Sequence, residues 1–143
     1  MNISKLLSLR VRNIRTNPFV KDLNAQSVLL SSKIKDKKIL IIGGAGTIGS
    51  SYIKQILKYK PSKITAVDIN ENSLTELTRD LRSSSLLDYN PEYITYPANL
   101  LSETFDKIFN SDNWDVVSNF SAHKHVRSEK DKISVEALIK NNV

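Results

Sequence analysis

Hydrophobic and polar positions form two kinds of segment along most of this chain. Leu74, Leu77 and Leu81 recur with helical spacing after Asn70, a good helix-capping residue, and so predict one buried helix face. The same spacing predicts helices at about residues 47–59, 72–83, 103–110 and 130–142. Short runs rich in Ile, Val and Thr predict strands at about residues 38–42, 63–68, 92–96 and 115–120.

Regular alternation of strand and helix predicts the fold class. Such chains form α/β folds in which right-handed crossovers place helices on both faces of a parallel sheet. We therefore expect a Rossmann-type sheet, partial because only about four strands fit within residues 38–143. The expected strand order is 3-2-1-4, with a ligand over the carboxyl ends of strands 1 and 4.

Charge divides the chain into a basic arm and a near-neutral domain. Residues 1–38 hold nine Lys/Arg and two Asp/Glu, a net charge of +7, whereas residues 39–143 carry −1. Within the arm, taken as residues 1–37, we expect a short amphipathic helix at 6–14 and then a second helix or an extended segment over 22–38. The arm could contact nucleic acid or acidic lipid. Packing on the domain or on a partner subunit is favoured, because no aromatic residues interleave the basic ones.

Overall composition bounds the remaining possibilities. Hydrophobic residues make up 40% and charged residues 25% of the chain, as in ordinary globular domains. No apolar run reaches the length of a membrane span, so we expect a cytoplasmic protein without one. The chain has no cysteine, which excludes disulfides and thiolate chemistry. Its two histidines, His123 and His125, make no metal site by themselves.

A glycine-rich turn follows the first predicted strand. Gly43, Gly46 and Gly49 are spaced by three, and a helix begins near Thr47 and Ile48. In a dinucleotide-binding turn the first glycine permits the tight turn, the second leaves the backbone open to a pyrophosphate, and the third allows close helix packing. The start of the helix then offers free N–H groups to the phosphates.

An acidic residue ends the second predicted strand at the spacing that a dinucleotide fold requires. Asp68 lies 19 positions after Gly49, where a carboxylate can bind both ribose hydroxyls. Ile69 and Asn70 follow, with no Arg to receive a 2′-phosphate, so NAD is preferred over NADP. The alternative is a structural strand-turn-helix with a chance aspartate.

After the third predicted strand, Asn99 and Leu100 lie where a small polar residue would approach the adenine edge. A plain turn is the alternative interpretation of Asn99, because Asn favours turns in any fold.

Polar residues also follow the fourth predicted strand. Phe120, Ser121 and Ala122 end that strand and are candidate cofactor contacts, because reacting groups lie at the carboxyl ends of central strands. Lys124 and His125 come next and could form an acid/base set, a phosphate clamp or a solvated loop.

Four segments together resemble one protein superfamily. Gly43–Ser50, Val67–Leu74, Ala122–Val126 and Asn142–Val143 are similar to the extended short-chain dehydrogenases/reductases. Within that superfamily they most resemble the polysaccharide-biosynthesis nucleotide-sugar dehydratases, the UDP-N-acetylglucosamine 4,6-dehydratase group. Lys-His-Val within the third segment is the most specific part, since most other relatives lack it.

The resemblance implies the NAD-binding part of a nucleotide-sugar dehydratase or epimerase of surface polysaccharide biosynthesis. It further implies a UDP-sugar substrate, a homo-oligomer, and a substrate-side role for Lys124 and His125. The group's catalytic Asp-Lys pair and Tyr-x-x-x-Lys lie further along a longer chain, so the catalytic residues are unknown here and these 143 residues are expected to be inactive alone. The pattern Tyr59 to Lys63 is rejected because it lies at the wrong end of the sheet. The alternative is a stand-alone NAD-binding or sensing module without catalysis.

The chain departs from the group's pattern at a few positions. The departure at the end of the fourth strand places larger side chains there, which could crowd the nicotinamide side of the cofactor. The departures are Ile69 and Asn70 for Arg-Ser, Asn99 for Asp, Phe120 and Ser121 for two small residues, and Arg127 for Pro.

Overall fold

The computed structural model describes residues 20–122 and 131–142, with side chains to residue 140. The helix expected at residues 6–14 lies outside these residues, and so do Lys124 and His125. The chain divides into two units, residues 1–33 and 34–143, and each is described by itself. Within the described residues, no helix is both long enough and apolar enough to cross a membrane.

Within the described part of the N-terminal segment, residues 20–34 form two short helices, α2 (Val20–Ala25) and α3 (Ser27–Ile34). This differs from the single helix or extended segment expected over 22–38. At the junction the Ser27 hydroxyl donates to the Asn24 carbonyl at 2.8 Å. Polar side chains that bond to the local backbone in this way compete with a continuous helix.

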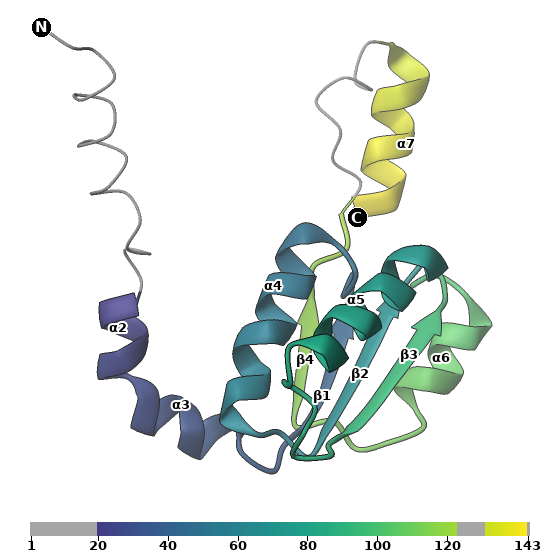
Figure 1. Ribbon diagram of the computed structural model, residues 1–143. Helices are drawn as coiled ribbons and strands as arrows, with labels where there is room; N and C mark the ends of the chain where they lie inside the picture. The colour runs from purple at the N-terminus through teal and green to yellow at the C-terminus, as the bar shows by residue number, and fades with distance from the viewer. Residues whose placement is uncertain (1–19, 123–130, 143) are drawn as a thin grey trace, which may run out of the picture. The chain divides into compact units, whose positions relative to one another are not determined.

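Four parallel strands form the sheet of the second unit (Figure 1), in the order β3-β2-β1-β4. This confirms the predicted topology. The strands are β1 (Lys38–Ile42), β2 (Lys63–Asp68), β3 (Glu92–Pro97) and β4 (Val116–Asn119). The helices are α4 (Thr47–Ile56), which continues as the 3₁₀ helix η1 (Leu57–Tyr59), α5 (Glu71–Ser83), α6 (Glu103–Phe109) and α7 (Lys132–Asn142).

Helices cover both faces of the sheet, as predicted, and this explains the unbroken apolar run of β1. Ile39 and Ile41 join a core with α4 and α5, whereas Leu40 and Ile42 join a second core with α6. Successive side chains of a strand point to opposite faces, so a strand covered on both sides must be apolar throughout. Ile39, Leu40 and Ile41 are at most 1% exposed.

An ion-pair network joins the strands at the amino edge of the sheet. The Asp112 carboxylate lies 2.7 Å from the Lys38 ammonium and 3.0 Å from that of Lys63. Lys63 also lies 2.9 Å from Glu92, and Asp115 accepts a 2.9 Å hydrogen bond from the Lys38 amide. A hydrogen bond from Lys38, which has the larger effect, and one from Lys63 lower the pKa of Asp112 to about 2. Charged side chains therefore hold the starts of β1, β2 and β3 and the segment before β4 together.

Candidate functional site

The glycine-rich turn at the carboxyl edge is tied to the end of β2. The amides of Gly43 and Gly44 both donate to the Val67 carbonyl, at 2.8 and 3.1 Å. The amide of Ala45 donates to Oδ2 of Asp68 at 3.0 Å. The path of the turn is therefore fixed by its neighbouring strand, before any ligand binds.

Crowding within the protein accounts for three of the four glycines. Gly43 has φ of +71°, and a Cβ there would lie 2.6 Å from the amide nitrogen of Ser121. A Cβ on Gly49 would lie 2.2 Å from the carbonyl oxygen of Gly43, and one on Gly44 would lie 3.0 Å from the Ala66 Cβ. The role of Gly44 was missed in the sequence because it falls outside the three-residue spacing.

Gly46 is different, because nothing in the described part of the chain requires a glycine there. Its backbone is ordinary, with φ −67° and ψ 166°, and the only atom of the described residues that a Cβ would meet is the Gly43 oxygen at 3.5 Å. The missing side chain instead leaves open space beside the start of α4. The first N–H groups of that helix have no partner four residues back, and Gly46 has no side chain to cap them.

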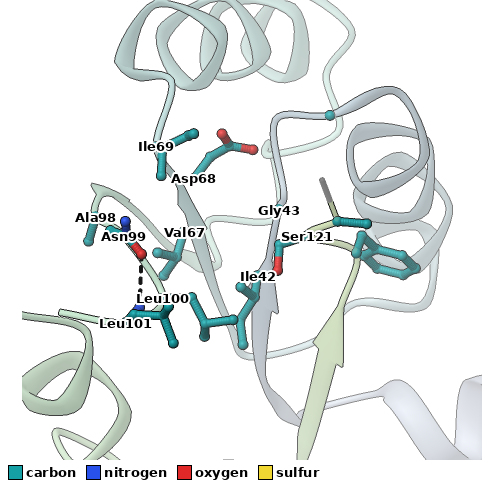
Figure 2. Close-up of a pocket in the computed structure, with 13 residues that line it drawn as sticks. Ile42, Gly43, Val67, Asp68, Ile69, Ala98, Asn99, Leu100, Leu101 and Ser121 are labelled. Atoms are coloured by element: carbon teal, nitrogen blue, oxygen red, sulfur yellow. Dashed lines mark hydrogen bonds between the residues drawn. The ribbon is translucent and has the colours of Figure 1, made fainter. Parts of the chain in front are cut away.

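A cavity of about 320 Å³ lies at this edge of the sheet (Figure 2), within the usual size range of small-molecule sites. Its lining comes from the ends of β1 and β2 and from the segments that follow all four strands. Among the described residues, Asp68 is the one charged residue in the lining. The lining residues are Ile42, Gly43, Gly46, Val67, Asp68, Ile69, Ala98, Asn99, Leu100, Leu101, Phe120, Ser121 and Ala122.

Most of the predicted cofactor contacts lie in this lining, and a few do not. Asn70 instead caps α5, where its Oδ1 accepts from the Ser73 amide at 3.0 Å. Strand-end and loop positions were missed, because apolar residues there carry no signal distinct from the core. The predicted residues outside the lining are Thr47, Ile48, Gly49 and Asn70, and the missed ones are Ile42, Val67, Ala98 and Leu101.

Asp68 holds a fixed position at the side of the cavity. Its Oδ1 accepts from the Asn70 amide and its Oδ2 from the Ala45 amide, both at 3.0 Å. Each carboxylate oxygen has a second lone pair, so both remain able to accept from a ligand hydroxyl. The carboxylate therefore braces the turn and still presents acceptors to the cavity.

Asn99 lines the cavity and also makes a turn. Its Oδ1 accepts from the Leu101 amide at 2.9 Å, the dashed bond in Figure 2. The side-chain oxygen of Asn99 therefore serves the turn, as the alternative interpretation predicted. Its contact with an adenine stays a prediction.

The chain leaving β4 runs directly beside the glycine turn. The Phe120 amide donates to the Ile42 carbonyl at 2.8 Å. Asn119 Oδ1 then accepts from the amide and the hydroxyl of Ser121, at 2.9 and 2.6 Å. Backbone bonds and the Asn119 side chain therefore fix this segment on the opposite side of the cavity from Asn99 (Figure 2).

The rejected Tyr59-to-Lys63 pattern lies away from the cavity. Tyr59 ends η1, and Lys63 is the first residue of β2, where its ammonium pairs with Asp112 and Glu92. Neither residue lines the cavity at the carboxyl edge.

Residues 39–143 match the sequence family described as "Polysaccharide biosynthesis protein". The chain is 44% identical over 57 residues to the "Uncharacterized membrane protein MJ1061" of Methanocaldococcus jannaschii, which is 40% of this chain and 17% of that protein. It is 30% identical over 99 residues to the "Capsular polysaccharide biosynthesis protein CapD" of Staphylococcus aureus, which is 68% of this chain and 16% of that protein. The matched stretches thus span a small part of these relatives.

The fold is also similar to solved structures. A protein of Haemophilus influenza described as a D-mannonate oxidoreductase, solved with bound NAD, superposes with a TM-score of 0.60 at 16% identity. The superposition covers 79% of this chain and 48% of that one. At this identity the likeness shows the fold alone.

Proposed function

Because this chain belongs to the family of polysaccharide biosynthesis proteins, we propose that residues 38–143 are the NAD-binding part of a nucleotide-sugar 4,6-dehydratase or epimerase. The observation that carries the proposal is Gly46. Its missing side chain has no explanation within the described protein and leaves the cavity open beside the start of α4. A pyrophosphate needs that close approach to backbone N–H groups.

The other cavity residues fit the remaining parts of NAD. Asp68 offers acceptors to the adenosine ribose and would repel a 2′-phosphate. Ile69 and Leu101 are 76% and 79% exposed, and they give the adenine end an apolar border near Asn99 and Leu100. When bound, NAD would supply a hydride acceptor. The Haemophilus influenza structure of similar fold, which was solved with bound NAD, supports this assignment.

Features of a longer protein are part of the same proposal. A UDP-sugar substrate, a substrate-side role for Lys124 and His125 and a homo-oligomer are implied by the resemblance, and a cytoplasmic location is expected from the sequence. The matched stretches cover 17% and 16% of two relatives, so these features stay predictions for the whole protein.

Calorimetric titration of NAD and NADP into the 143-residue chain tests the cofactor. We expect NAD to bind more tightly, and Gly46→Val to abolish measurable binding because its side chain fills the phosphate position. Ser51→Val is the matched control, since it places the same side chain on an exposed position of α4. Tighter NADP binding by the wild type, or unchanged NAD affinity in Gly46→Val, would contradict the assignment.

Incubation with NAD and UDP-N-acetylglucosamine tests whether the chain is catalytically complete. We expect no 4-keto-6-deoxy product by mass spectrometry, because the resemblance places the base for the sugar hydroxyl beyond Val143. Product formed at an ordinary enzymatic rate, on the order of 1 s⁻¹, would show that the catalytic groups lie within residues 1–143.

A further inference from the structure

A tyrosine on α4 contacts the chain that leaves β4. The Tyr52 ring packs on that of Phe120, with centroids 5.0 Å apart and planes inclined by 54°. The hydroxyl of Ser118 donates to the Tyr52 oxygen at 3.2 Å. All three side chains are half-buried. Tyr52 belongs to none of the motifs above, and the proposed cofactor contacts do not include it.

The residue that Tyr52 holds is part of the cavity wall. Phe120 lines the cavity, and its amide is bonded to the Ile42 carbonyl on β1. On one side the following peptide already touches the turn, since a Cβ on Gly43 would lie 2.8 Å from the Phe120 carbonyl carbon. The side chain of Tyr52 supports the same segment from α4.

Strand order decides which part of a ligand meets this wall. Asp68 ends β2, Gly43 follows β1 and Phe120 follows β4, and β1 lies between β2 and β4 in the sheet. A dinucleotide with its adenosine ribose at Asp68 and its diphosphate beside Gly46 therefore meets Phe120 with its other half.

We propose that Tyr52 is a positioning residue that, through Phe120 and Ser118, holds the exit of β4 as the wall for the nicotinamide half of NAD. The inference rests on the proposed function. Tyr52 itself contacts no cofactor in this arrangement, and an aromatic contact of this kind restricts the movement of the segment that it supports.

Comparing ADP with NAD tests the proposal, because ADP carries only the adenosine and diphosphate parts. The full chain and its variants are titrated with both ligands by calorimetry, and circular dichroism confirms that each is folded. We expect Tyr52→Ala to weaken NAD binding by about fivefold to tenfold and ADP binding by less than about twofold. Tyr52→Phe keeps the ring contact and should restore most of the NAD affinity.

Two further variants keep the test decisive. Tyr59→Ala removes the same side chain at the far end of the same helical segment, and should leave the NAD-to-ADP affinity ratio unchanged. If Tyr52→Ala does not fold, Phe120→Leu removes the ring pair while keeping an apolar side chain, and should show the same selective loss.

Several results would overturn the proposal. Equal loss of ADP and NAD affinity in Tyr52→Ala would show that the tyrosine supports the whole site. Unchanged NAD affinity, or a wild type that binds ADP as tightly as NAD, would show that the nicotinamide half of NAD does not bind against this wall. A wild type that binds neither ligand would instead refute the proposed function itself.

Discussion

At the amino edge of the sheet, long charged side chains join the strands. At the carboxyl edge, hydrogen bonds from backbone amides join them, and glycines without side chains allow the close packing. Asp112 sits between two ammonium groups at the first edge. At the second edge, Gly43 and Gly44 bond to Val67, and the turn packs so closely that Gly49 has no room for a Cβ. Filling one edge with side chains stabilises it, and keeping them out of the other leaves a cavity.

Two aspartates make the contrast concrete. Asp112 has ammonium partners, and its carboxylate is used within the fold. Among the described residues, Asp68 accepts only from backbone amides, and it lines the cavity with lone pairs to spare. Similar carboxylates at opposite ends of one sheet should therefore affect different properties, stability for Asp112 and binding for Asp68.

The largest effect is expected at Gly49, where the carboxyl edge has no space. Gly49→Ala should lower the free energy of unfolding by about 3 kcal/mol or more, because its Cβ would lie 2.2 Å from the Gly43 oxygen. Urea unfolding followed by circular dichroism measures this. Gly46→Ala is the control and should unfold near the wild-type midpoint, since its Cβ meets no atom of the described residues closer than 3.5 Å. Equal midpoints for Gly49→Ala and Gly46→Ala would refute the account of crowding.

Asp68 should affect ligand choice. Asp68→Ala is expected to reduce the preference for NAD over NADP by roughly 1–3 kcal/mol, because it removes charge-assisted hydrogen bonds to the ribose. Paired NAD and NADP titrations measure the difference. Asp112→Ala, at the other edge, should leave both affinities unchanged. A change of the same size in Asp112→Ala would break the division between the two edges.

Asp112 should affect the pH dependence of stability. Its pKa in the folded protein is about 2, below the ordinary value of 3.8, so it stabilises the fold above pH 3.8 and loses this effect as the pH falls toward 2. Asp112→Asn should be less stable at neutral pH and lose less stability over that acidic range. Unfolding midpoints at several pH values measure both, with the exposed Asp88→Asn as control. Parallel pH profiles for wild type and Asp112→Asn would contradict the role of the network.

The smallest effect is expected between the two edges. Thr65, in the middle of β2, is 1% exposed, and its hydroxyl has no hydrogen-bond partner among the described residues. Thr65→Val should raise the free energy of unfolding by about 1 kcal/mol, because an unpaired buried hydroxyl is costly. Thr78→Val is the control and should not stabilise, since it removes a hydroxyl bonded to the Leu74 carbonyl. Destabilisation by Thr65→Val would imply an unrecognised partner.

The fold could be predicted because its signals are local. The unbroken run of β1, the Asn70 cap and the leucine spacing of α5 each follow from short stretches of sequence. Strand order then followed from a general rule for alternating chains. The junction between α2 and α3 was missed, because a serine bonding to a carbonyl three residues back has no periodic pattern.

The site was predictable only in part. Spacing identified Gly43, Gly46 and Asp68, which line the cavity. It could not identify Tyr52. This residue lies on the helix that follows β1, whereas its partner Phe120 is distant in the chain and follows β4. Contacts of that kind depend on the pairing of β1 with β4, and no short segment contains both.

The pairing of β1 with β4 also sets the order in which the site can form during synthesis. Lys38 and Asp115, bonded across this pair, are 77 residues apart in the chain. Closing so long a loop is slow compared with local steps. A nascent chain that has emerged only as far as β3 holds Asp68 and the glycine turn but lacks the opposite wall. Nucleotide that requires both walls would therefore bind only after β4 pairs with β1, and its binding would stabilise that pairing.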